Sequence, residues 1–289
     1  MRNFKTRASF FLWLIIANID IIFIQETHCT KKDKKKWGRE WGGQNWWSTG
    51  TKNSKGVGIL CNPKFKYDID TKNMKIDNSG RYIVCDLTHG DRKFRLINIY
   101  APNNEYERVR FFVNMHQWFD PNLETFCAGD YNCTLYDTDR LNCIGSNDLG
   151  RIDLQKIMLD FDLEDVYKRR YPLANTYSFR RGIKASRLDF WLISKTLDNT
   201  VDQIKYEPCL YSDHSLVTIK VNTSDVEHGG GVWKMNASIL TTELFKVSFE
   251  SMWKRWRSQK DKCSNLGEWW DLGKKKNQRS CSMVLEETK

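Results

Sequence analysis

Near its middle the sequence runs Phe126-Cys127-Ala128-Gly129-Asp130-Tyr131-Asn132. The short apolar run predicts a buried strand, and the glycine followed by polar residues predicts where that strand ends. Because side chains alternate along an extended chain, Asp130 and Asn132 are expected to point into one space beyond the strand's carboxyl end. Open α/β sheets commonly place their chemistry at such strand ends. A carboxylate beside an amide suits a proton acceptor paired with an oxygen-orienting group, although Asp-x-Asn is also a common turn.

Strand-like and helix-like segments surround this stretch on both sides. The expected strands include residues 21–24, 56–60, 82–87, 94–100, 186–194 and 216–221. Residues 105–119 and 153–161 have the periodicity of helices that bury one side. Strands that alternate with helices, with hairpins among them, predict an α/β domain that has mixed sheets and outer helices.

The composition of the chain indicates the kind of partner and the cellular compartment to expect. The 289 residues are 40% hydrophobic and carry a net charge of +10, which favours a polyanionic partner. The nine cysteines include no C-x-x-C pair, so a zinc or redox motif of that kind is excluded. Cys29, Cys61, Cys85 and Cys127 lie in or beside apolar runs, as reduced buried thiols do. We therefore expect an intracellular, reducing compartment.

The N-terminus has two interpretations. Basic residues precede an apolar stretch over residues 10–24, which imitates a signal peptide or a membrane anchor. Asn18 and Asp20 interrupt that stretch, and no small-x-small cleavage site follows it. A helix over residues 6–17 and a buried strand over residues 21–24 fit better.

The last part of the chain differs in character. Residues 227–231 form a linker-like break, and the chain beyond Trp233 is rich in tryptophan and helical in pattern. We expect one domain over residues 1–221 and a helical connector over residues 222–289.

Polar residues recur where the expected strands end. They are Glu26, Tyr100, Asn103, Asp130, Asn132, Asp189, Asp213 and His214. Carboxylates, amides, a phenol and an imidazole suit metal-assisted phosphodiester hydrolysis, in which Mg²⁺ binds one or two carboxylates and substrate oxygen. The basic residues Arg180, Arg181, Lys184 and Arg187 flank this set, either as a DNA-facing loop or as a solvated hairpin tip.

Five ordered motifs make the sequence resemble the endonuclease/exonuclease/phosphatase superfamily. They are Gln25-Glu26-Thr27-His28, Ile99-Tyr100-Ala101-Pro102-Asn103, Gly129-Asp130-Tyr131-Asn132, Ser186-Arg187-Leu188-Asp189 and Ser212-Asp213-His214-Ser215. The resemblance covers residues 5–221 and is strongest to the apurinic-type endonuclease domain of non-LTR (long interspersed element) retrotransposons. The tail resembles the connector before the reverse transcriptase of such elements, through Trp233-Lys234-Met235-Asn236, Trp269-Trp270 and Gly273-Lys274.

The resemblance implies a four-layer α/β sandwich, with two mixed β-sheets face to face and helices outside. It implies a Mg²⁺-dependent endonuclease that nicks double-stranded DNA, with Mn²⁺ as an alternative ion. The implied metal ligands are Glu26 and Asp213. The implied catalytic residues are Asp130, Asn132, His214, Asp189 and Tyr100. The implied substrate-binding residues are Asn103, Ser178, Arg180, Arg181, Arg187 and Ser212. The implied protein is a monomer that acts in the nucleus without a membrane, and its partner in cis is the reverse transcriptase domain of the parent element.

One departure from the family pattern affects the expected activity. The family normally begins with a strand that ends in a catalytic asparagine, whereas this sequence starts at about the following helix. We therefore expect an N-terminally truncated fragment that lacks a strand beside residues 21–24. Two other functions stay open: a catalytically impaired DNA-binding remnant, and a secreted or anchored family member acting on phospholipids or small phosphoesters.

Overall fold

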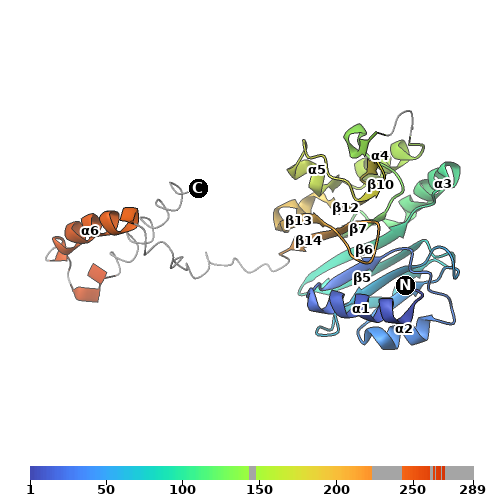
Figure 1. Cartoon of the computed structure of the whole chain (residues 1–289), viewed down its shortest axis with the longest axis horizontal. Helices are drawn as coiled ribbons and strands as arrows, with labels where there is room; N and C mark the ends of the chain where they lie inside the picture. The colour runs from blue at the N-terminus through green and yellow to red at the C-terminus, as the bar shows by residue number, and fades with distance from the viewer. Residues whose placement is uncertain (143–147, 223–242, 261–262, 264, 268, 271–289) are drawn as a thin grey trace. The chain divides into compact units, whose positions relative to one another are not determined.

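The computed structural model describes residues 1–142, 148–222, 243–260, 263, 265–267 and 269–270. The chain divides into two compact units, Met1–Ser224 and Asp225–Lys289 (Figure 1). In the second unit, α6 (Glu243–Arg257) carries Trp256, whose ring stacks on Trp269 with centroids 4.5 Å apart. The predicted connector residues 233–236 and 273–274 lie outside the described residues.

A six-stranded mixed sheet forms the centre of the first unit. Its strands are, in spatial order, β4 (Asp68–Ile76), β5 (Tyr82–His89), β6 (Arg92–Tyr100), β7 (Glu124–Asp130), β12 (Asp189–Ser194) and β9 (Leu163–Asp165). The β6–β7 pair is parallel, and the other neighbouring pairs are antiparallel. Because side chains alternate, both faces of this sheet carry apolar residues and both need a covering layer.

A second layer of strands covers one face. It contains β2 (Asn45–Ser48), β3 (Val57–Cys61) and β1 (Ile21–Ile24), paired in the order β1-β3-β2, and the separate pair β13 (Val201–Glu207) and β14 (Leu216–Val221). Ile59 and Ile204 from this layer share a buried cluster with Ile83, Phe94 and Phe126 of the six-stranded sheet.

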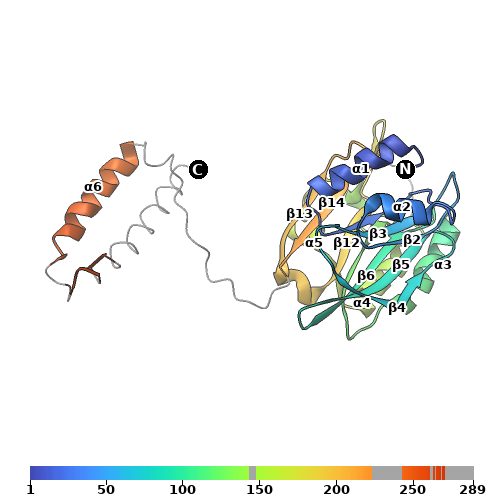
Figure 2. The same ribbon diagram turned by 90° about the horizontal axis from the view of Figure 1, so that it is seen from below.

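Helices form the two outer layers (Figure 1 and Figure 2). α3 (Glu105–Met115) and α4 (Arg151–Asp160) bury Phe112 and Leu154 against the six-stranded sheet. α1 (Phe4–Ile16) and α2 (Lys34–Trp41) pack with β1 and β3 through residues such as Leu14, Trp37 and Ile22. The predicted four-layer α/β sandwich is thus confirmed.

The shorter elements of the unit are β8 (Arg140–Leu141), α5 (Val166–Arg170), β10 (Phe179–Arg181), β11 (Lys184–Ser186) and the 3-10 helices His116–Trp118, Asp137–Asp139 and Lys195–Thr200.

The N-terminal segment folds as the predicted helix and strand. Asn3 caps α1 by accepting a hydrogen bond from the Thr6 amide at 3.2 Å. Among the described residues, no helix is both long and apolar enough to cross a membrane. The four cysteines predicted to be buried thiols, Cys29, Cys61, Cys85 and Cys127, are buried and free.

Candidate active site

Three site residues lie side by side at the edge of the six-stranded sheet. Asp130 ends β7 and is in register with Tyr100 on β6 and with Asp189 on β12. Residues in register on neighbouring strands point to the same face. This face is the one covered by the second layer of strands, because Tyr100 belongs to the buried cluster between the two layers. The hydrogen bonding of the sheet itself therefore brings together three residues that are spread over 89 positions of the sequence.

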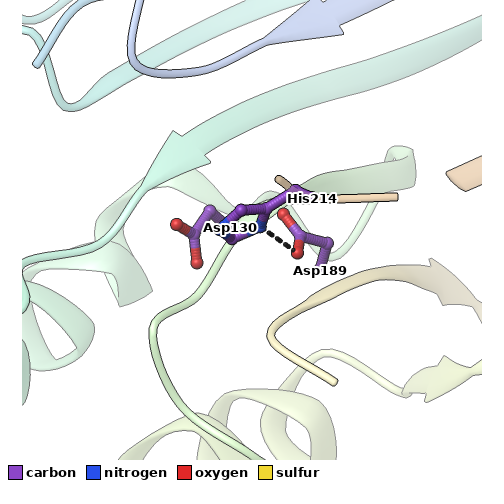
Figure 3. A group of neighbouring side chains, drawn as sticks. All are labelled: Asp130, Asp189 and His214. Carbon is purple, nitrogen blue, oxygen red and sulfur yellow. Dashed lines mark hydrogen bonds and ion pairs between the residues drawn. The ribbon is translucent and has the colours of Figure 1, made fainter. Parts of the chain in front are cut away.

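His214 joins this row from the segment that precedes β14. Its Nδ1 lies 2.7 Å from Oδ2 of Asp189 (Figure 3). One ligand atom each of Asp130, Asp189 and His214 lies within 4.8 Å of the other two. The backbone of His214 also bridges to Phe179 at the start of β10, and the imidazole lies against the Phe179 ring, with ring centroids 4.9 Å apart.

Charges in this cluster depend on one another. Burial raises the pKa of Asp130, and the neighbouring charge of Asp189 raises it further, although His214 acts in the opposite direction. Burial disfavours a charged imidazole at His214, but the hydrogen bond and charge of Asp189 outweigh burial and raise the pKa of His214 to about 9. At neutral pH both ring nitrogens of His214 are therefore donors, one bonded to Asp189 and the other available to a ligand.

A second pair, Glu26 and Tyr100, adjoins Asp130, because Tyr100 is in register with Asp130. The Tyr100 hydroxyl donates a hydrogen bond to Glu26 Oε1. Glu26 has a φ of +48°, which costs free energy for a residue with a Cβ atom and turns its carboxylate out of the strand direction of β1. Burial raises the pKa of Tyr100, and its bond to Glu26 raises it further, so the phenol stays protonated.

Asn132 forms an Asp-x-Asn turn and also orients the Asp130 carboxylate, which are the two roles that the motif allows. Its backbone amide donates to Asp130 Oδ1 at 2.9 Å, which makes the Asp-x-Asn turn. Its side-chain amide donates to the Ala101 carbonyl at 2.9 Å and to Asp130 Oδ2 at 3.3 Å. Asn132 thus holds both oxygens of the Asp130 carboxylate and ties β7 to the end of β6.

Five further predicted residues are exposed at the protein surface. Asn103, Ser212 and Asp213 are exposed, and the Ser212 hydroxyl accepts a hydrogen bond from the His214 amide at 3.0 Å. Arg180 and Arg181 are exposed on the β10–β11 hairpin, where Arg180 lies over the Tyr177 ring. In the described part of the chain, the cluster spaced closely enough to hold a metal contains neither Glu26 nor Asp213.

Two predicted substrate contacts are wrong. Arg187 is fully buried, and its guanidinium bonds Asp139 at 2.8 and 2.9 Å and Asp165 at 2.6 Å. Ser178 is also fully buried, and its hydroxyl accepts the amides of Leu188 at 2.9 Å and Asp189 at 3.0 Å. Arg187 therefore neutralises buried acids, and Ser178 fixes the backbone that carries Asp189.

Sequence reasoning missed two supporting residues, Asn98 and Arg81. Asn98 is fully buried, accepts a hydrogen bond from Gln25 at 2.7 Å and donates to the Gly58 carbonyl at 2.8 Å, which anchors the turn that presents Glu26. Its signal was a polar residue within the apolar end of the strand, residues 96–100. Arg81 lies over the Tyr100 ring and donates to the Tyr100 and Ala101 carbonyls. Nothing in the sequence around Arg81 indicates that it supports the site.

A profile of the Endonuclease/Exonuclease/phosphatase family matches residues 5–214, which are most of the chain. The chain belongs to this family. An uncharacterized 149 kDa protein of transposon TX1 from Xenopus laevis is 28% identical over 261 residues, which are 88% of this chain. The chain spans 20% of the length of that relative.

Solved structures of two AP endonucleases and a 3'-5' exonuclease share the fold. An AP endonuclease from Leishmania major is 16% identical, with a TM-score of 0.61 over 75% of this chain and 82% of that one. An AP endonuclease from Archaeoglobus fulgidus is 17% identical, with a TM-score of 0.61 over 75% and 95%. A 3'-5' exonuclease from Neisseria meningitidis is 20% identical, with a TM-score of 0.61 over the same shares. At these identities the likeness concerns the fold.

The donor chemistry of the site fits a hard divalent cation. Glu26, Asp130, Asp189 and Asp213 supply carboxylate oxygens along one cavity, and carboxylate oxygens are what Mg²⁺ and Mn²⁺ prefer. Asp130 and Asp189, with His214, form the group whose ligand atoms are close enough to share an ion, and Glu26 lines the same cavity.

Proposed function

We propose that this protein nicks DNA by hydrolysing one phosphodiester bond with the help of a divalent cation. The observation that carries the proposal is the cluster of Asp130, Asp189 and His214, which lines one cavity together with Glu26. Tyr100, beside Asp130 in the sheet, bonds Glu26. Family membership supports hydrolysis of a phosphoester, and the transposon relative supports DNA as the substrate.

In this proposal Asp130 orients the attacking water and accepts its proton. Asn132 keeps both carboxylate oxygens of Asp130 in place through its two hydrogen bonds. Water adds to phosphorus, the bond to the leaving oxygen breaks, and that oxygen takes a proton from solvent. A bound Mg²⁺ would polarise the phosphate and neutralise developing charge.

His214 stabilises charge on the phosphate as a hydrogen-bond donor. Asp189 holds the imidazole by Nδ1 and favours its charged form, so Nε2 carries the proton that faces the substrate. Tyr100 and Asn103 line the position of the scissile phosphate. The oriented donor acts without reorganisation during the reaction, which is the general advantage of such sites.

We further propose that the unit works as the endonuclease of a longer retrotransposon polypeptide, on double-stranded DNA in the nucleus and together with a reverse transcriptase domain. The match to a transposon protein over 88% of this chain supports this setting.

Nicking of supercoiled plasmid tests the proposal. The wild-type protein should nick with Mg²⁺ and stop with excess EDTA, and Asp130→Asn should abolish nicking. Asp91→Asn is the control, because Asp91 is an exposed carboxylate in the β5–β6 turn at the other end of β6 from Tyr100. Nicking that persists in the chelator or in Asp130→Asn would overturn the mechanism.

The same preparation distinguishes the two alternative functions. Binding of DNA without cleavage would favour a catalytically impaired DNA-binding remnant. Cleavage of phosphatidylcholine or another phosphoester without DNA nicking would favour a family member that acts on phospholipids or small phosphoesters.

A further inference from the structure

Tyr206 donates a hydrogen bond to the backbone of the residue that holds the active-site imidazole. Its hydroxyl lies 2.8 Å from the carbonyl oxygen of Asp189, whose side chain bonds His214. Tyr206 lies on β13 in the second layer of strands, whereas Asp189 begins β12 in the six-stranded sheet. The bond therefore joins the two layers at one member of the Asp189–His214 pair.

The direction of this hydrogen bond is fixed at both ends. Nη1 of Arg187 lies 3.4 Å from the Tyr206 hydroxyl oxygen, and a guanidinium can only donate. The carbonyl of Asp189 can only accept. The hydroxyl therefore accepts from Arg187 and donates to Asp189. Burial raises the pKa of Tyr206, so the phenol keeps the proton that this bond requires at neutral pH.

The neighbours of the Tyr206 hydroxyl and ring are themselves held in place. Arg187 is fully buried, and its guanidinium bonds Asp139 at 2.8 and 2.9 Å and Asp165 at 2.6 Å. Two carboxylates fix the plane of the guanidinium, and hydrogen bonds in such a buried network strengthen one another. The Tyr206 ring also meets the Tyr167 ring edge to face, with centroids 4.7 Å apart. Groups outside the active site thus determine where the hydroxyl lies.

Side chains and backbone hold both peptide groups that flank Asp189. On one side, the Ser178 hydroxyl accepts the Asp189 amide at 3.0 Å, and the Tyr131 amide donates to the Leu188 carbonyl at 2.9 Å. On the other side, Tyr206 holds the Asp189 carbonyl. Because each peptide group is planar, fixing both of them fixes the direction of the Asp189 Cα–Cβ bond. The carboxylate therefore starts from a defined position when it bonds the imidazole.

A second bond joins the same strands next to this site. Tyr206 is in register with Val217 on β14, the strand that follows His214. The Trp191 indole of β12 donates to the Val217 carbonyl at 3.2 Å. One bond thus runs from β13 to β12, and the other runs from β12 to β14. Together they fix the spacing of the two layers beside the 2.7 Å contact between Asp189 and His214.

We propose that Tyr206 is a positioning residue, whose hydroxyl holds Asp189 and, through Asp189, the His214 imidazole. Tyr206 acts on the pair and not on the substrate, because its hydroxyl is already bonded to Arg187 and Asp189. The inference rests on the proposed function, in which His214 donates to the phosphate. Misplacing that donor should slow turnover and leave DNA binding in place.

Tyr206→Phe tests the hydroxyl, since phenylalanine keeps the ring. Partners that orient active-site ligands contribute about 10- to 100-fold, so kcat for nicking supercoiled plasmid should fall by that factor, while KM for DNA stays within about twofold. Tyr167→Phe is the matched control, because Tyr167 is also partly buried and touches Tyr206, but its hydroxyl bonds Thr176 at 2.6 Å. The control should keep the wild-type kcat.

Three outcomes of this comparison would overturn the proposal. Equal losses of kcat in Tyr206→Phe and Tyr167→Phe would assign the effect to packing. A loss confined to KM would place Tyr206 in DNA binding. A Tyr206→Phe chain that fails to unfold cooperatively in a thermal melt, while Tyr167→Phe does so, would assign the hydroxyl to the fold alone.

A second readout does not depend on nicking. In protein labelled with 15N-histidine, NMR in slightly acidic buffer should show the His214 Nδ1 proton that bonds Asp189, and His214→Gln assigns it. Tyr206→Phe should speed exchange of this proton with water at least about tenfold through local opening, and Tyr167→Phe should not. An unchanged exchange rate in Tyr206→Phe would overturn the inference. If the wild type does not nick DNA, the proposed function fails, and this exchange rate still decides whether Tyr206 holds the pair.

Discussion

Nδ1 of His214 lies 2.7 Å from Oδ2 of Asp189, although 25 residues separate them in sequence. The carboxylate begins β12, and the imidazole precedes β14, so the pair joins the two layers of strands at the active site. The side chains of Asp189 and His214 are 13% and 26% exposed, so solvent screens their interaction only in part.

Asp189→Asn should reduce nicking by about 10² to 10⁴-fold, the usual contribution of a positioned donor or base. The amide keeps the shape of the side chain but removes the charge that raises the pKa of His214. NMR titration of the imidazoles can follow this, because the chain has only five histidines. The pKa of His214 should be about 9 in the wild type and lower in the variant. A wild-type His214 that titrates at an ordinary value would contradict this account.

The same pair predicts how stability depends on pH. Because the pKa of His214 is raised in the folded state, its contribution to stability is fully present below the unfolded value of about 6.5 and is lost as the pH rises through about 9. Urea unfolding should therefore show a larger difference between wild type and Asp189→Asn at pH 6 than at pH 10. An equal difference at both pH values would mean that the charged pair does not stabilise the fold.

Substitutions at Asn132 can separate its backbone from its side chain. Asn132 has a φ of +46°, which glycine adopts freely and alanine does not. Asn132→Gly and Asn132→Ala both remove the amide that bonds Asp130, but only alanine adds strain, of about 1–2 kcal/mol. Both variants should lose similar activity, while thermal unfolding should show the alanine variant to be less stable. Full activity in Asn132→Gly would show that the amide is dispensable for holding Asp130.

The buried cluster around Arg187 should matter more for stability than for DNA binding. Arg187→Met leaves the buried Asp165 without its cation, and breaking such a buried pair costs about 3–5 kcal/mol. Asp139 keeps only Lys168, whose Nζ lies 3.5 Å from Asp139 Oδ1. Arg180→Met is the matched control, because Arg180 is exposed and such changes cost about 0.5 kcal/mol or less. Denaturant unfolding measures both variants. Similar losses for the two would contradict the buried role of Arg187.

Strands and site residues were predictable where a strong local pattern coincides with a strand end. The run before Asp130 and the segment Ile21–Ile24 appear at the predicted places, because short apolar runs bounded by polar turns have few alternatives. Asp130, Asp189, Tyr100, His214 and Glu26 meet as the ordered motifs implied.

Arg187 and Ser178 show what a one-dimensional pattern cannot provide. An arginine next to exposed basic residues reads as surface, but β11 and β12 turn it toward Asp139 and Asp165, which lie 48 and 22 positions upstream. Likewise, the role of Ser178 depends on the amides of Leu188 and Asp189, which become neighbours only in the folded sheet. Which distant acidic and basic side chains pair with one another depends on the register of the strands, and a local sequence pattern does not give that register.

The β10–β11 hairpin is the proposed DNA-facing surface. Arg180, Arg181 and Lys184 are exposed on this hairpin, next to the segment that holds His214. Phosphate contacts release counterions, so each lost contact should reduce the slope of log affinity against log salt by about 0.9. Changing all three to alanine should therefore weaken binding to duplex DNA at low salt and reduce the slope of log affinity against log salt by up to about 2.7.

Changing Lys31, Lys34 and Lys35 to alanine removes the same charge from an exposed stretch at α2 and is the matched control. Fluorescence anisotropy between low and moderate salt measures both variants. If the two triple variants change the slope equally, net charge rather than the hairpin governs binding.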